Sequence, residues 1–496
     1  MSEHNVQTAH HAGHEQGPPL SFAAGEPVTR VETALIQAHG YAALASLMIT
    51  ALFGTAVAIK MVQPDFLGHQ LWSTWGSMRA NHLQGILFGW LGNAFIAFLY
   101  FAVPRLSGRP VQSATLGWWV FGLWNGGVVL LGWVLVSLNL PNDWWGIKPL
   151  EWTEFPLVVN LVTEVCLGML ALQFIPPLAR KPNPDGMYIS SWYITGALVF
   201  TLLSFPVGSL VPQLVPGAIG AAFSGLWIHD AVGIYVTPLS LAIIFFVLPV
   251  RTGRPIYSHF LSMIGFWLLF FSYPLNGTHH YVYSSIPMDT QRAAIAASVI
   301  MGFDVMLVVF NLLMSLRGQA ARVWRDVPLR YIWTSIVLYL VVSLQGALQA
   351  LMPMQRHLHF SDWVIGHSHL AMLGFASFAV LGGLAHVWER TFAHRYRERA
   401  INLAYWLILG GLLVMFVDLT TAGIVQGRFW TSAAPWMESV RRSEAFWLVR
   451  ALAALPILLG FAAFIAGMVS GRGKRPAARG HAPLRQGAAA PLASGG

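Results

Sequence analysis

The fold is decided by long apolar stretches such as residues 363–388, which read WVIGHSHLAMLGFASFAVLGGLAHVW. This stretch is long enough to cross the ~30 Å hydrocarbon core of a membrane as a helix, and it holds no lysine, arginine, aspartate or glutamate. In lipid the backbone polar groups must be satisfied within the segment, so a run of this length is a helix and not a strand. His367 and His369 lie near its start, where an ionisable side chain is a functional candidate by default.

Similar apolar runs recur along the chain, which is 56% hydrophobic and only 10% charged. Soluble domains carry about 25% charged residues. We therefore predict an all-α membrane protein, a bundle of about twelve transmembrane helices. Their approximate limits are 32–60, 80–103, 113–138, 154–176, 188–211, 220–250, 257–277, 290–315, 328–352, 363–388, 400–425 and 443–470.

The two ends of the chain differ from this central domain, which we place at residues 26–470. Residues 1–25 are polar and contain four histidines, and they lack the basic and apolar regions of a secretory signal. Residues 471–496 are basic and rich in glycine, alanine and proline. We expect both segments to be disordered cytoplasmic tails.

The net charge of +9 does not indicate a nucleic-acid partner, because the basic residues lie between the apolar segments and not along one stripe. Of the 29 lysine and arginine residues, twenty fall on one side of the predicted topology and eight on the other, with Arg450 inside the last span. The positive-inside rule then places both termini in the cytoplasm, and we expect a multi-pass protein of a bacterial inner membrane. Cys166 is the only cysteine, which excludes a disulfide within the chain and a thiolate metal cluster.

Six of the eighteen histidines are predicted to lie at one depth, in the outer half of the membrane. The predicted topology does not depend on histidine, so the shared depth of the six is independent support for a functional site. A hydrogen-bonded contact between helices would explain one such histidine, but not six at one level. The six are His82, His229, His279, His280, His367 and His369.

The spacing of the six separates two kinds of site. His367 and His369 are about 200° apart around a helix, so their rings point to opposite sides. They cannot share one metal, but each can serve a different haem. An electron-transfer haem needs two axial ligands, which His82 and one of His367 and His369 can supply. The remaining histidine would be the single protein ligand of a second haem, whose other face stays open. His279 and His280 at a helix end, with His229, make a three-imidazole site, and imidazole suits copper, iron and zinc.

These residues resemble the haem-copper oxidase superfamily, catalytic subunit I, and are most similar to its C-type branch, the cytochrome cbb₃ oxidases, and the related nitric oxide reductases. The similarity covers roughly residues 30–470. The motifs that carry it are Arg79-Ala-Asn-His82-Leu-Gln, Trp227-Ile-His229-Asp-Ala-Val-Gly, Gly265-Phe-Trp with Tyr273 and Gly277-Thr-His279-His280, and Phe360-Ser-Asp-Trp-Val-Ile-Gly-His367-Ser-His369.

The resemblance implies a bundle that encloses two haems and a third metal site. The low-spin haem b would take His82 and His369, the high-spin haem (b or a variant) His367, and a copper ion the three residues His229, His279 and His280.

Tyr273 stands six residues before His279, where the C-type family has a redox-active tyrosine linked to the copper-ligand histidine of the sixth helix. The resemblance implies that Tyr273 lies beside His229, within bonding or hydrogen-bonding distance of its ring. Dioxygen cleavage takes four electrons at once, and a tyrosine beside the metals can supply one together with a proton. The alternative is a tyrosine that only packs between helices.

The resemblance also suggests roles for charged residues near the haem propionates. Glu151 and Glu154 are similar to an acidic pair of which one carboxylate binds calcium, a hard ion that prefers oxygen ligands. We favour Glu151 for calcium, with a solvated loop charge as the alternative. Arg79 and Arg450 are expected to pair with propionates, since arginine makes bidentate contacts with carboxylates.

The sequence departs from the C-type pattern at several positions. Asp230 follows His229 where an asparagine is usual, and Phe245 begins the inner end of the sixth helix where tyrosines commonly lead protons inward. Gln345 and Gln349 stand in the region of a family glutamate. Asp304 is an unexpected carboxylate in the eighth helix. These changes put proton uptake from the cytoplasm in doubt.

The resulting functional hypothesis is reduction of dioxygen to water. The chain has neither a Cys-x-x-Cys-His haem c motif nor a dicopper cysteine motif, so electrons must enter from a partner subunit that carries haem c or a copper centre. The alternative is a nitric oxide reductase of the same superfamily with non-haem iron in the third site. That chemistry favours an added carboxylate and needs no tyrosine, so Tyr273 favours the oxidase.

A solute transporter is the third reading. Transporters tend to show broken helices at related positions in two halves, and no such repeat is evident. Six histidines at one level would also have no purpose in a transporter.

Overall fold

The computed structural model describes residues 29–180, 186–215, 217–392 and 396–471, and these are helical, with no strand among them. Twelve helices in this part of the chain are long and apolar enough to cross a membrane, which confirms the predicted fold class. The two expected tails, 1–25 and 471–496, lie outside the described residues except for Gly471.

Three of the first six candidate spans contain a π-helical segment, and one ends in an additional short helix. The six spans are α1 (Thr33–Val62), α2–η3–α3 (Trp75–Ser107), α4–η4–α5 (Ala114–Leu138), α6 (Leu157–Ala179), α7–α8 (Ile189–Leu214) and α9–η5–α10 (Gly217–Thr252).

The last six spans are joined by loops that hold the short helices α13 (Ala320–Arg325) and α15 (Met352–Leu358). They are α11–η6 (His259–Tyr281), α12 (Met288–Ser315), α14 (Val327–Gln349), α16–η7–α17 (Asp362–Thr391), α18 (Glu398–Trp430) and α19 (Trp436–Val469).

Three of the twelve spans form the centre of the bundle. In the spans Trp75–Ser107, Gly217–Thr252 and Asp362–Thr391, 94% of the most apolar window is buried by protein, against 67% or less in the other nine. A helix that is apolar all round and buried all round belongs to the core of a bundle. Four of the six histidines singled out above are carried by these three central spans.

Each central span contains a π-helical segment. These segments are η3 (Gly85–Gly92), η5 (Ala231–Val236) and η7 (Leu370–Ser377), and each begins within three residues after His82, His229 or His369. A π turn holds extra backbone in the helix and is frequent at functional sites. Trp90 of η3 donates a hydrogen bond of 3.0 Å to Ser377 of η7, which fixes two of the segments to each other.

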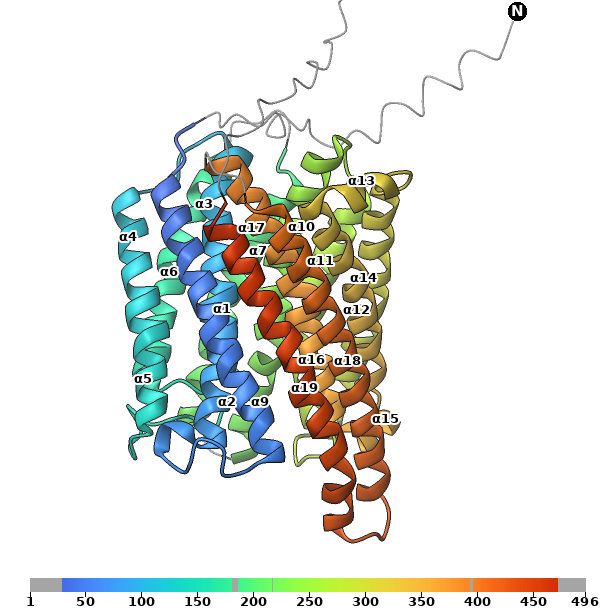
Figure 1. The fold of residues 1–496 in the computed structure, drawn as a ribbon. Helices are drawn as coiled ribbons and strands as arrows, with labels where there is room; N and C mark the ends of the chain where they lie inside the picture. The colour runs from blue at the N-terminus through green and yellow to red at the C-terminus, as the bar shows by residue number, and fades with distance from the viewer. Residues whose placement is uncertain (1–28, 181–185, 216, 393–395, 472–496) are drawn as a thin grey trace, which may run out of the picture.

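The first residues of α1 and the last residues of α19 lie at the same end of the bundle, and α18 and α19 extend beyond its opposite end (Figure 1). At the end where α1 begins, Arg251 of α10 (Thr237–Thr252) pairs with Asp326 at 3.2 Å and Glu389 at 2.7 Å. These ion pairs tie α10 to the start of α14 and the end of α17 (Phe378–Thr391).

Candidate functional site

His82 and His369 face each other across a cavity between α1, α2 (Trp75–Gln84) and α16 (Asp362–His369). Their ring centroids are 6.4 Å apart and their planes differ by 23°. Two metal–nitrogen bonds of about 2.0 Å and two ring radii of about 1.1 Å would place the centroids about 6.2 Å apart. The gap between the two imidazoles is therefore wide enough for one metal ion held by both rings.

The ring nitrogens of this pair are oriented by the main chain. Nδ1 of His82 lies 2.8 Å from the carbonyl oxygen of Thr50, and Nδ1 of His369 lies 2.8 Å from that of Ile365. A carbonyl oxygen only accepts, so each Nδ1 is the donor, and each Nε2 keeps its lone pair for a metal. Gly54 makes the fit possible, because a Cβ at that position would lie 2.5 Å from Cε1 of His82.

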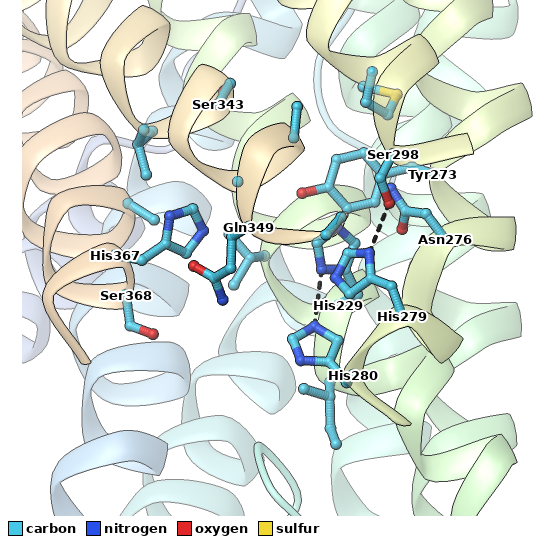
Figure 2. A pocket seen from close by; sticks show the side chains of 18 of the residues that line it. His229, Tyr273, Asn276, His279, His280, Ser298, Ser343, Gln349, His367 and Ser368 are labelled. Carbon is cyan, nitrogen blue, oxygen red and sulfur yellow. Dashed lines mark hydrogen bonds between the residues drawn. The ribbon is translucent and has the colours of Figure 1, made fainter. Parts of the chain in front are cut away.

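His229, His279 and His280 form a second cluster, with one ligand nitrogen from each within 4.8 Å of the others (Figure 2). Nδ1 of His229 lies 3.1 Å from Nε2 of His280, and two ligands on one tetrahedral metal with ~2.0 Å bonds are about 3.3 Å apart. Nδ1 of His279 lies 2.7 Å from the hydroxyl of Ser298. That hydroxyl donates to the carbonyl of Ala294 at 2.8 Å, so it accepts from His279 and leaves Nε2 free.

His367 lies on the opposite side of the same cavity from the three histidines (Figure 2). Its Nδ1 is 3.1 Å from the side-chain oxygen of Gln345. The amide oxygen accepts, so Nε2 of His367 is again the free nitrogen. One cavity thus holds a single histidine on one wall and three on the other, as a haem facing a third metal requires.

Tyr273 of α11 (His259–Asn276) lines this cavity and stacks on His229, with ring centroids 4.6 Å apart and planes 19° apart. The sequence led us to expect an edge contact within bonding or hydrogen-bonding distance. The structure instead lays the rings face to face, and it shows no hydrogen bond between these two described residues. Gly233, one turn after His229, explains the flat contact, because a Cβ there would lie 1.5 Å from Cε1 of Tyr273.

Arg79 lies between the two glutamates that follow the third span. Its Nη1 is 3.2 Å from Oε1 of Glu154, and its Nη2 is 3.4 Å from Oε1 of Glu151. Gln84 donates a 2.5 Å hydrogen bond to Glu154. Burial raises the pKa of Glu154 to about 7, although the charge of Arg79 opposes this shift. The side chain of Glu151 is 46% exposed, so the buried member of the pair is Glu154, while calcium binding at Glu151 stays a prediction.

Arg450 lines the cavity between His82 and His369 and is only 9% exposed. Among the described residues no hydrogen bond or ion pair reaches its guanidinium, although Asp362 and Asp418 are near enough to interact with it electrostatically. A buried cation that borders a cavity without a direct partner fits an anionic ligand there. The residues present therefore fit a haem with its propionates, and the pairing itself stays a prediction.

Two further buried histidines have contacts of a different kind. His39 lies 2.7 Å from Asn93 through Nδ1, and His386 accepts a 2.8 Å hydrogen bond from Arg251. Neither joins one of the two clusters. They show what a histidine that only links helices looks like in this bundle.

Several residues that shape the site were not foreseen from the sequence. Ser298 and Gln345 orient His279 and His367, while Gly54 and Gly233 leave room for the rings of His82 and Tyr273. Gln345 was noted only as a departure from a family glutamate. A glycine one turn after a metal-ligand histidine was a usable signal, whereas nothing marked Ser298 among the other serines of the chain.

Comparison with known proteins gives one consistent result. The sequence profile described as "Cytochrome C and Quinol oxidase polypeptide I" matches residues 34–456. The chain is 27% identical to the "Cbb3-type cytochrome c oxidase subunit CcoN1" of Stutzerimonas stutzeri, over 84% of this chain and 88% of the relative. It is 26% identical to a "Cytochrome c oxidase subunit 1 homolog" of Agrobacterium tumefaciens, over 89% of this chain and 84% of the relative.

A solved structure of a haem-copper terminal oxidase dimer has the same fold, with a TM-score of 0.66 at 15% sequence identity. The match covers 87% of this chain and 84% of that one. The arrangement of the twelve spans is therefore shared with a protein of very different sequence.

Proposed function

Because this chain belongs to the cytochrome c and quinol oxidase polypeptide I family, the haem-copper oxidases, we propose that it reduces dioxygen to water as the catalytic subunit of a terminal oxidase. The observation that carries this proposal is the stacking of Tyr273 on His229 at 4.6 Å, in a cavity with three clustered histidines and His367 opposite. Family membership also removes the transporter reading.

Two haems and a copper ion, when bound, supply electrons and an open coordination position for a small ligand. In our proposal His82 and His369 hold a low-spin haem b, and His367 holds the high-spin haem, of type b or a variant. Their Nδ1 groups donate to protein oxygens, which keeps each ring in one tautomer and one orientation. His229, His279 and His280 present three imidazole nitrogens to the copper.

Tyr273 distinguishes the two candidate reactions. Cleavage of dioxygen takes four electrons, and a phenol beside the cavity can give one electron and one proton. Nitric oxide reduction needs only two electrons and no tyrosine. The non-haem iron site of that alternative favours a carboxylate, and within the described residues no carboxylate joins the cluster of His229, His279 and His280. Both observations support the oxidase.

One observation favours the alternative. The inner half of α10, where tyrosines were expected to lead protons inward, is formed by buried apolar side chains that include Phe245 and Phe246. A nitric oxide reductase can draw its protons from the outer side and needs no such route. This alternative is kept as the second candidate.

The remaining parts of the proposal concern the surroundings of the subunit. We propose a bacterial inner-membrane protein with both termini in the cytoplasm, so that the end of the bundle where α1 begins is the inner end. Electrons enter from a partner subunit with haem c or a copper centre, and Glu151 binds calcium near Arg79 and Glu154. Of the relatives, one is named as a cbb3-type cytochrome c oxidase subunit, which is consistent with this assignment.

The test is a Tyr273→Phe variant of the complete enzyme. We expect it to keep both haems and the third metal but to lose nearly all dioxygen reduction, while nitric oxide reduction changes much less. Oxygen-electrode rates, pyridine-haemochrome spectra and metal analysis measure these quantities. Tyr405→Phe is the matched control, because Tyr405 is a buried tyrosine that bonds Thr334 at 2.7 Å away from both cavities.

Dioxygen consumption at the parent rate in Tyr273→Phe would contradict the oxidase mechanism. Iron in place of copper in the third site would move the nitric oxide reductase ahead.

A further inference from the structure

Asp304 is a carboxylate in the middle of α12 with no partner among the described residues. It is 1% exposed, and neither of its oxygens has a hydrogen bond. No described lysine, arginine or histidine lies within ion-pair distance of it. An ionised carboxylate at membrane depth needs a cation, donors or water, and residues of this kind mark ion and proton pathways. Neither the metal centre nor the packing of α12 accounts for its presence.

A buried hydroxyl group close to Asp304, that of Tyr193, also lacks a partner. A Cβ added to Gly265 of α11 would lie 3.3 Å from Oδ1 of Asp304 and 3.7 Å from the hydroxyl of Tyr193 on α7. The Tyr193 hydroxyl is buried and makes no hydrogen bond. The absence of a side chain at Gly265 therefore brings a carboxyl and a phenol together at one point, and both retain free donor and acceptor capacity.

Outward from Asp304, α12 reaches the cavity of the metal centre. Met301 and Val305, which flank Asp304 on α12, line the cavity of the three histidines. Tyr339 of α14 lines the same cavity and is near enough to interact electrostatically with Asp304, Tyr193 and Tyr273. Tyr339 is thus close both to the carboxyl group and to the tyrosine that we place in the reaction.

Inward from Asp304, α12 continues with Asn311 and Ser315, which lie seven and eleven residues on and share its face of the helix. Asn311 donates to the Ser262 hydroxyl and to the Ser258 carbonyl, both at 2.9 Å. Ser262 is three residues before Gly265, the position beside Asp304. About one helical turn of α11, or about 5.4 Å, therefore separates Ser262 from the level of Asp304. One water molecule can bridge a gap of that size between polar groups.

We propose that Asp304 is the proton relay of this enzyme, taking protons from the Ser258–Ser315 end and passing them past Tyr339 to the cavity of Tyr273. The inference rests on the proposed function only in that the site consumes protons. Each dioxygen reduced to two waters takes four protons with four electrons. Only protons pass Asp304: its O–H proton leaves toward the cavity, one from the inner end replaces it, and the residue is unchanged.

This route differs from the one expected along α10. There the apolar residues Leu241–Leu248 leave no polar group, and Phe245 stacks on Tyr193 at 5.5 Å. The polar side chains lie instead where α11 packs against α12.

The test compares Asp304→Asn with Asp304→Glu in the complete enzyme. Asparagine fills nearly the same space but holds no exchangeable acid proton. We expect turnover to fall about 100-fold, with the haem spectra and metal content of the parent, and the solvent deuterium isotope effect to rise because proton delivery becomes limiting. Asp304→Glu should recover most of the rate. Glu164→Gln is the matched control, because Glu164 is a half-buried carboxylate of α6 that lines neither cavity.

An Asp304→Asn enzyme with the parent rate and the parent isotope effect would overturn the relay. So would equal losses in Asp304→Asn and Asp304→Glu without a change in isotope effect, since a packing defect predicts that pattern. If the parent enzyme reduces nitric oxide and not dioxygen, the proposed function fails while the relay is tested in nitric oxide turnover, which also consumes protons.

Discussion

The two cavities of this bundle differ in what orients their histidines. In the cavity of His82 and His369, both Nδ1 groups bond main-chain carbonyl oxygens, those of Thr50 and Ile365. In the other cavity, Nδ1 of His367 bonds the side chain of Gln345 and Nδ1 of His279 that of Ser298.

The histidines of the first cavity are therefore oriented by helix packing, and those of the second cavity by particular side chains. A main-chain carbonyl stays in place whatever side chain its residue carries, so the paired histidines depend on the positions of α1 and α16. The histidines of the second cavity can be retuned by one substitution, because partners of metal ligands set their orientation and basicity.

The largest expected effect comes from removing one ligand of each cavity. His279→Ala should abolish turnover and lose the third metal while the low-spin haem spectrum remains. His369→Ala should lose that spectrum and retain the three-histidine metal. Reduced-minus-oxidised spectra and metal analysis of both variants measure this, with exposed His357→Ala as the control. If either substitution removes both signals, the two cavities are not independent and the histidines hold the fold.

A smaller effect is expected from Gly233→Ala. The added methyl group would overlap the ring of Tyr273, so the ring must leave His229 while the ligands stay in place. Dioxygen reduction should fall about 100-fold, with both haems and the metal retained. Gly126→Ala is the control, because a Cβ at Gly126 meets nothing within 4 Å. Parent-like oxygen consumption in Gly233→Ala would mean that the stacked position of Tyr273 does not matter.

The smallest expected effect tests whether the histidines of the two cavities differ in what orients them. Gln345→Leu removes the Nδ1 partner of His367 and should lower activity about 10- to 100-fold, as for other partners of metal ligands. Thr50→Val keeps the carbonyl that holds His82 and should leave the low-spin spectrum unchanged. Oxygen uptake and haem spectra measure both. A spectral change in Thr50→Val as large as the loss in Gln345→Leu would remove the distinction between the two cavities.

The transmembrane spans could be predicted because the hydropathy of a segment depends only on the residues within it. The depth of the histidines followed from the same topology, so their gathering in two clusters was accessible without a structure. The sequence predicted only in part the direction in which each histidine or tyrosine ring points. The separation of His367 from His369 follows from helix geometry, whereas the stacking of Tyr273 depends on Gly233 in another span.

The acidic pair shows where sequence reasoning ends. Glu151 and Glu154 are three residues apart, and the sequence favoured Glu151 for calcium. The backbone between them includes Trp152 with φ of 64°, a left-handed conformation. This turn places Glu154 inside against Gln84 and leaves Glu151 near the surface. A conformation of this kind at a tryptophan is rare, so no local pattern indicated it.

The hydrogen bond between Trp90 and Ser377 limits which insertions and deletions these two transmembrane spans can accept during evolution. Both residues lie in π-helical segments, η3 and η7, that hold extra backbone within a transmembrane span. Deleting one residue from either segment would leave a span long enough for the membrane, but would rotate one half of it by about 100° against the other. Trp90 and Ser377 would then no longer meet. We therefore expect a deletion within either segment to break this contact, whereas a deletion in an exposed loop would leave it intact.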